Sequence, residues 1–148
     1  MYRWVLIAHG AWRWVVVAAG VALVVAALLG VWRRTAWSPA TARLGRFFGI
    51  AVDIQVLMGA TLYLVLSPLT NDAFSAAQSV AAGSDMQFFA LRHALIMTFT
   101  LVAVHVSAVI VRRGRDDATR QRRAALCYGI TLLILMSAIP WWRPWLRL

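Results

Sequence analysis

Three histidines, His9, His93 and His105, are the side chains of this sequence best suited to chemistry. Imidazole binds metals and changes its charge near neutral pH, and an ionisable side chain inside an apolar segment is costly and usually functional. Other ionisable candidates are few, because the chain has no Glu, no Lys and only five acidic residues, all Asp. What the protein does therefore depends on where its helices place these three rings.

The composition is that of a membrane protein. Of its 148 residues, 62% are hydrophobic and the mean hydropathy is +0.74, whereas soluble domains have roughly 45–50% apolar residues. The net charge of +10 comes from Arg alone. Because most of these arginines lie in short loops between apolar segments, we assign them to membrane topology and expect no nucleic-acid partner. The single Cys127 excludes an internal disulfide or a cysteine-based metal site.

Four apolar segments have close to the ~20 residues that a helix needs to cross a bilayer. We expect spans at about 4–32, 47–66, 88–111 and 124–142. No segment alternates between apolar and polar residues, so the predicted fold is all-α, an integral membrane four-helix up-down bundle in which residues 1–148 form a single domain. The first span is expected to be retained rather than cleaved as a signal peptide, because its apolar run is long and Arg33 follows directly.

The arginines also predict the orientation. They gather in the loops after the first and third spans, whereas residues 67–87, between the second and third spans, contain no basic residue. By the positive-inside rule both Arg-rich loops are cytoplasmic and both termini are extracytoplasmic. We therefore expect a multi-pass protein of the bacterial inner (cytoplasmic) membrane, in contact with the lipid bilayer and with other membrane subunits or a redox partner.

Helix geometry separates the histidines into an outer pair and a lone inner ring. At a rise of ~1.5 Å per residue, His9 and His93 lie level near the outer face, on spans that run in the same direction and are diagonal in an up-down bundle. Two such imidazoles could ligate a metal-centred macrocycle such as haem through bonds of ~2.0 Å. Arg13, one turn after His9, and Arg92, beside His93, could bind haem propionates or reach lipid headgroups instead.

His105 lies ~18 Å deeper than His93 along the same helix and cannot share a metal with it. Asp53, in the second span, is at a similar distance from the cytoplasmic edge. We expect these two side chains to meet, buried, in the inner half of the bundle, with Gln55 among the polar groups nearby. A hydrogen-bonded pair that fixes helix packing is the favoured interpretation, and a proton relay or a quinone site is the alternative.

Five short motifs are spread over nearly the whole chain, at residues 9–14 (His-Gly-Ala-Trp-Arg-Trp), 53–63, 88–93, 122–129 and 138–141. They resemble one family of small four-helix bacterial membrane proteins, known as cytochrome b-like. In the second motif, Gln55, Gly59 and Tyr63 match the family pattern Gln-x-x-x-Gly-x-x-x-Tyr. The resemblance implies a b-type haem protein with His9 and His93 as axial ligands, in which Arg92 replaces the Glu that often precedes the second histidine.

These observations lead to three function hypotheses. The first is a small integral membrane b-type cytochrome-like protein, with one haem b between His9 and His93 near the outer face, that transfers single electrons. The second is a cofactor-free or pigment-binding accessory subunit of a larger respiratory or photosynthetic membrane complex. The third is a small transporter or proton conductor that uses Asp53 and His105. A stand-alone enzyme is not expected, because the sequence has no nucleophile–base constellation and no phosphate loop.

Overall fold

The computed structural model of the chain describes residues 1–66 and 88–141. This part of the chain is helical, without any strand, as the sequence predicts. It contains the helices α1 (Tyr2–Arg33), α2 (Pro39–Thr61), α5 (Ala94–Arg112) and α6 (Asp117–Ser137). Two short π-helical segments extend them: η1 (Leu62–Leu66) continues α2, and η2 (Phe88–His93) leads into α5. The predicted loop at 67–87 lies outside the described residues.

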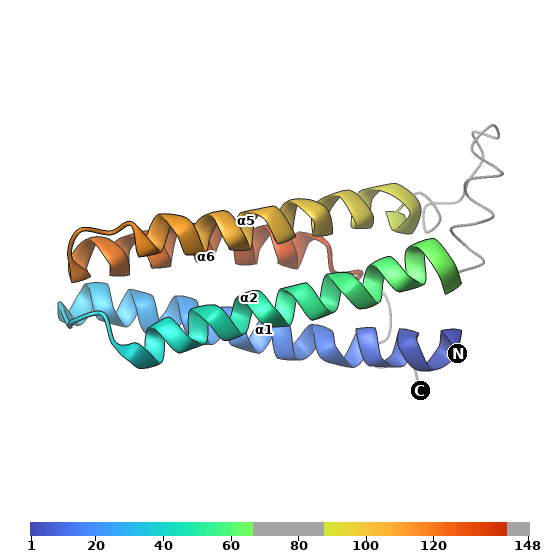
Figure 1. The fold of residues 1–148 in the computed structure, drawn as a ribbon, viewed down its shortest axis with the longest axis horizontal. Coiled ribbons are helices and arrows are strands. Elements are labelled where there is room, and N and C mark those ends of the chain that lie inside the picture. The colour runs from blue at the N-terminus through green and yellow to red at the C-terminus, as the bar shows by residue number, and fades with distance from the viewer. Residues whose placement is uncertain (67–87, 142–148) are drawn as a thin grey trace.

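The four long helices run alternately up and down (Figure 1). Helix α1 packs against α2 and α6, and α5 packs against α6 and α2, so that α1 and α5 are diagonal. Both short connections, from α1 to α2 and from α5 to α6, lie at the same end of the bundle (Figure 1). The N-terminus of α1, the end of η1 and the beginning of η2 lie at the opposite end. The Arg-rich segments are therefore together at one end, and His9 and His93 are near the other.

Three helices are long and apolar enough to cross a membrane, namely Tyr2–Arg33, Pro39–Leu66 and Leu91–Arg112. Helix α6 is not among them over the described residues. Its first two turns carry Asp117 and several arginines, and it ends at Ser137, before Pro140, whose ring cannot continue a helix. The α-helix within the predicted fourth span of 124–142 thus ends at Ser137, and residue 142 lies outside the described part.

Apolar side chains such as Leu23, Phe48 and Val52 form the core of the bundle together with several polar ones, and large apolar side chains also cover its surface. The buried polar residues are Thr41, Gln55, Thr100, Ser107, Gln121 and Thr131. Ser107 and Thr131 join α5 to α6 through hydroxyl groups 3.1 Å apart. A Cβ atom on Gly20 would lie 2.9 Å from both Phe48 and Leu132, so a glycine is needed where α1 approaches α2 and α6. Small residues and hydroxyl pairs at helix contacts are typical of helices packed in lipid.

Candidate functional site

The structure brings His9 and His93 together. Their ring centroids are 6.3 Å apart, and the ring planes are inclined by 71°. His9 lies in the third turn of α1 and His93 is the last residue of η2, so the rings come from diagonal helices at the end of the bundle away from the Arg-rich connections. The level position that helix geometry predicts for these two histidines is therefore found in the structure.

Helix α2 forms one wall around His9. The Gln55 side-chain amide donates to the His9 carbonyl oxygen at 3.2 Å, and its nitrogen lies 3.1 Å from His9 Nε2. One turn further along α2, a Cβ atom on Gly59 would lie only 3.1 Å from His9 Cε1, so the ring packs against bare backbone. His9 Nδ1 is buried and has no hydrogen-bond partner among the described residues. Because the Gln55 amide nitrogen is the donor, Nε2 is the acceptor and the neutral ring carries its proton on the buried Nδ1.

His93 is held by the end of α6. Its Nδ1 lies 2.8 Å from the carbonyl oxygen of Ala138, the C-terminal capping residue of that helix. The last carbonyls of a helix lack partners within the helix, so this oxygen can accept the Nδ1 proton. The hydrogen bond selects the tautomer whose Nε2 carries a lone pair, which is the usual state of a histidine that ligates a metal through Nε2. The rings of Phe88 and Phe89 lie 5.8 and 5.9 Å from the His93 ring.

The backbone beside His93 is unusual. The π-helical segment η2 ends at His93, and regular α-helix begins at Ala94. Wide π-helical turns are rare and occur mostly as single turns at functional sites. Such a turn changes the direction in which successive side chains point, which allows Phe88, Phe89 and His93 to gather around the same place. The apolar sequence of this span contains no signal that would have predicted the π-helical turn.

The two arginines named as propionate ligands are placed differently. Arg13 is half-buried, with its guanidinium 5.0 Å from the Trp14 ring centre, and its charge acts electrostatically on both histidines. Arg92 is exposed, and no contact of its side chain with either histidine occurs among the described residues. The structure therefore places only Arg13 within the electrostatic reach of the histidine pair.

A tryptophan next to Arg13 ties the site to α2. Trp12 Nε1 donates to the carbonyl oxygen of Ala51 at 3.0 Å. This tryptophan is therefore part of the α1–α2 contact. Together with the amide of Gln55, it fixes the rotation of α1 relative to α2 and hence the direction of the His9 ring.

Asp53 and His105 meet as predicted, but not in the interior. His105 Nε2 lies 2.9 Å from Asp53 Oδ1 and joins α5 to α2. The side chains are 58% and 44% exposed for His105 and Asp53, respectively, so the expectation of a buried pair is wrong. Both residues lie at the edge where α2 and α5 meet, on the outside of the bundle. Gln55, expected near this pair, points to His9 instead, because it lies on the opposite side of α2.

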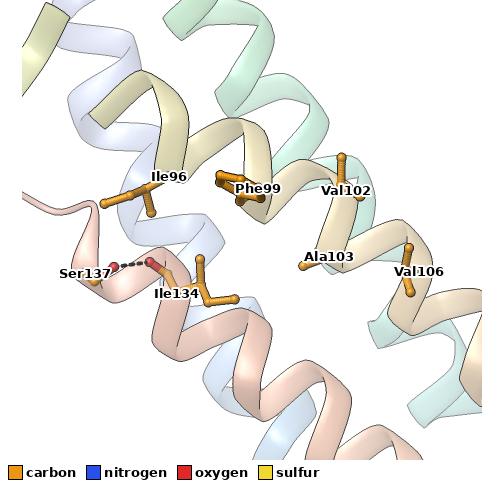
Figure 2. Close-up of a pocket in the computed structure, with 7 residues that line it drawn as sticks. All are labelled: Ile96, Phe99, Val102, Ala103, Val106, Ile134 and Ser137. Atoms are coloured by element: carbon orange, nitrogen blue, oxygen red, sulfur yellow. Dashed lines mark hydrogen bonds between the residues drawn. The ribbon is translucent and has the colours of Figure 1, made fainter. Parts of the chain in front are cut away.

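A groove between α5 and α6 lies apart from the His9–His93 pair, and neither Asp53 nor His105 lines it. It has a volume of about 480 Å³ and is lined by Ile96, Phe99, Val102, Ala103, Val106, Ile134 and Ser137 (Figure 2). The hydroxyl of Ser137, the polar group of this lining, is turned to the Ile134 carbonyl oxygen, 2.7 Å away. The groove therefore offers apolar contacts and no group for chemistry.

The donor set at the histidine pair is small. Within residues 1–66 and 88–141, no group of three or more His, Cys, Asp or Glu side chains is arranged to hold a metal ion. A bare ion would thus have two protein ligands at this place, whereas a metal already held in a macrocycle needs no more than two axial ligands.

A scan of protein-family models matched no family to this chain, and searches of curated proteins and of solved structures returned no match.

Proposed function

We propose that this chain is a small membrane cytochrome of the b type, which holds one haem between His9 and His93 and transfers single electrons. The distance between the two rings carries the proposal. Two metal–nitrogen bonds of ~2.0 Å, with each nitrogen ~1.1 Å from its ring centre, put two axial imidazoles on one metal ~6 Å apart between centroids. The observed separation is 6.3 Å.

One ring nitrogen of His93 is suited to ligation, because the hydrogen bond from His93 Nδ1 to Ala138 leaves Nε2 with a lone pair. On His9 the Gln55 amide nitrogen donates to Nε2, so the neutral ring carries its proton on Nδ1, which is buried without a partner in the described part of the chain. Ligation through His9 Nε2 would exchange the bond from Gln55 for a bond to the metal. An orphaned buried ring nitrogen is costly unless something binds it. The haem would supply one-electron chemistry and the remaining metal ligands, and the chain would supply two imidazoles from diagonal helices.

The surrounding side chains have definable roles in this proposal. Gln55 and the bare backbone at Gly59 set the position of the His9 ring. Phe88 and Phe89 keep water from His93, which lowers the local dielectric constant around the redox centre. The positive charge of Arg13 favours the reduced, less positive form of the centre and can bind a propionate.

The proposed location follows from the three helices that are apolar enough to cross a membrane. The Arg-rich connections lie at one end of the bundle and the histidine pair at the other. In a bacterial inner membrane the positive-inside rule would put the haem near the outer face, where it could exchange electrons with a periplasmic or membrane partner.

A second function has one observation in its favour. Each histidine already bonds to a neighbouring helix, His9 to α2 through Gln55 and His93 to α6 through Ala138. These bonds would lock the helices of a cofactor-free accessory subunit without any ligand. The accessory subunit and the cytochrome differ in whether the purified protein carries a redox-active chromophore.

The test is a reduced-minus-oxidised absorption spectrum of the protein purified in mild detergent from cells supplied with haem. The cytochrome proposal expects a Soret shift and an α-band, and the loss of at least tenfold of this signal in His9→Ala and in His93→Ala. His105→Ala is the matched control, because it removes the same side chain from the helix that follows His93 but from an exposed position. Wild-type protein without haem bands, or full haem retention in His93→Ala, would refute the proposal.

A further inference from the structure

The Asp53–His105 pair lies on a surface that should face hydrocarbon. Its exposed neighbours on α2 and α5 are apolar: Ile50, Ile54, Leu57, Val102 and Val106. Arg46 on α2 and Arg112 on α5 are each seven residues from the pair, which corresponds to ~10 Å along a helix. An Asp and a His at that depth, roughly half exposed, would be in contact with lipid chains, where ionisable groups are costly.

The pair has unused hydrogen-bonding capacity. Its internal bond uses Asp53 Oδ1 and His105 Nε2. The second carboxylate oxygen and the second ring nitrogen, His105 Nδ1, have no partner among the described residues. The oxygen accepts, and Nδ1 donates when the pair carries two protons, as in an Asp53 carboxylate bonded to a His105 imidazolium. In that state the seam, which is the line along which α2 and α5 pack, presents one free acceptor and one free donor side by side in an apolar surface.

This arrangement is complementary to itself. The bond runs across the seam between two antiparallel helices, so Asp53 and His105 lie at the same depth. A two-fold axis parallel to the helices would place the His105 of a second copy against Asp53, and the Asp53 of that copy against His105. Gly49, one turn before Asp53, has no atom within 4 Å of the place where a Cβ would be, so another chain could approach α2 there.

We propose that a second copy of this chain covers the α2–α5 seam and forms a membrane homodimer. At its centre, the four side chains of the two Asp53–His105 pairs would be joined in a ring of hydrogen bonds. The ring would satisfy the free donor and acceptor of each copy and remove all four side chains from lipid. The proposal depends on the placement of the bundle in a membrane. It does not depend on haem, because the α2–α5 seam is on the outside of the bundle. His9 and His93 lie between the helices, at the end away from the Arg-rich connections.

Cross-linking in native membranes tests which face is covered. In a Cys127→Ser background, Leu57→Cys places a thiol one turn from Asp53, and Leu133→Cys places one on α6, the helix diagonal to α2. The two leucines are matched in exposure, at 69% and 71%. We expect a thiol cross-linker to join Leu57→Cys chains into dimers at least fivefold more than Leu133→Cys chains. Equal yields, or an adduct that contains only another protein, would overturn the proposal.

An exchange of the two side chains tests the ring itself. Asp53→His/His105→Asp should form dimers with itself, but in mixed dimers with wild-type chains it would place Asp against Asp and His against His. Two differently tagged populations should therefore co-purify only within their own kind. Free mixing would overturn the proposal, as would an unchanged dimer in Asp53→Leu/His105→Leu. The helical circular dichroism spectrum of each variant verifies that the bundle has formed.

Discussion

Gly59 gives the sharpest test of how the histidine pair is positioned. A Cβ atom at this place would lie 3.1 Å from His9 Cε1, closer than carbon atoms ordinarily approach. The ring cannot turn freely, because Gln55 holds its nitrogen edge and its carbonyl. Gly59→Ala must therefore push the His9 ring away from α2 by a few tenths of an ångström, and Gly59→Val must push it further.

The change should affect haem binding as well as folding. Overpacking costs about 1–3 kcal/mol, and replacing a helical Gly with Ala returns up to about 1 kcal/mol through helix propensity. The free energy of unfolding should therefore change by less than about 2 kcal/mol. A shift of a few tenths of an ångström uses much of the ~0.5 Å within which a ligand must stay, so we expect Gly59→Ala to weaken binding by about 1.4 kcal/mol, tenfold in affinity. Gly59→Val should abolish binding.

The assay is a titration of haem into the apoprotein in detergent, followed at the Soret band, with thermal unfolding measured in parallel by circular dichroism. Gly129→Ala on α6 is the control, because no atom lies within 4 Å of its added Cβ. It should bind haem as the wild type does. Wild-type affinity in both Gly59 variants, or an equal loss in Gly129→Ala, would show that contact with α2 does not position His9.

Two further predictions concern stability. Gly20→Ala should lower the free energy of unfolding by about 1–3 kcal/mol, because its Cβ would lie 2.9 Å from the fully buried Phe48. Denaturation of both variants measures this change, with Gly129→Ala again as the control for helix propensity. At the beginning of α6, hydrogen bonds from Thr119 lower the pKa of Asp116. A lowered pKa contributes stability above the unfolded value, and this contribution is lost as the pH falls through the folded value. Asp116→Asn should therefore lose less stability than the wild type on acidification below about pH 4, and identical pH profiles would contradict this.

Much of the fold could be predicted because it depends on local properties of the chain. The apolar segments and the constant helical rise were enough to predict an all-helical, up-down arrangement and to put His9 level with His93. Helix α6 ends at Ser137, within the predicted span of 124–142, because Pro140 and the turn that precedes it end the α-helix.

The partners of each histidine could not be predicted. Helix α1 is apolar on all sides, so its sequence does not indicate which side faces α2. The contact of His9 with Gln55 and Gly59 depends on that rotation, and so does the direction of Trp12. The bond from His93 to Ala138 depends in addition on the place where α6 ends beside α5, and on a π-helical turn that has no mark in the sequence.

For each of the three histidines, the local sequence determines the depth of the residue, and the packing of the helices determines the direction of its side chain. The sequence by itself determined four helices, their alternating direction and the depth of each histidine, because these follow from hydrophobicity and a rise per residue that is the same in every helix. Only the tertiary structure decided that His9 and His93 face each other and that His105 and Asp53 point outward. The rotation of a helix about its own axis is set by side-chain packing against its neighbours, and a uniformly apolar helix does not record that rotation in its sequence.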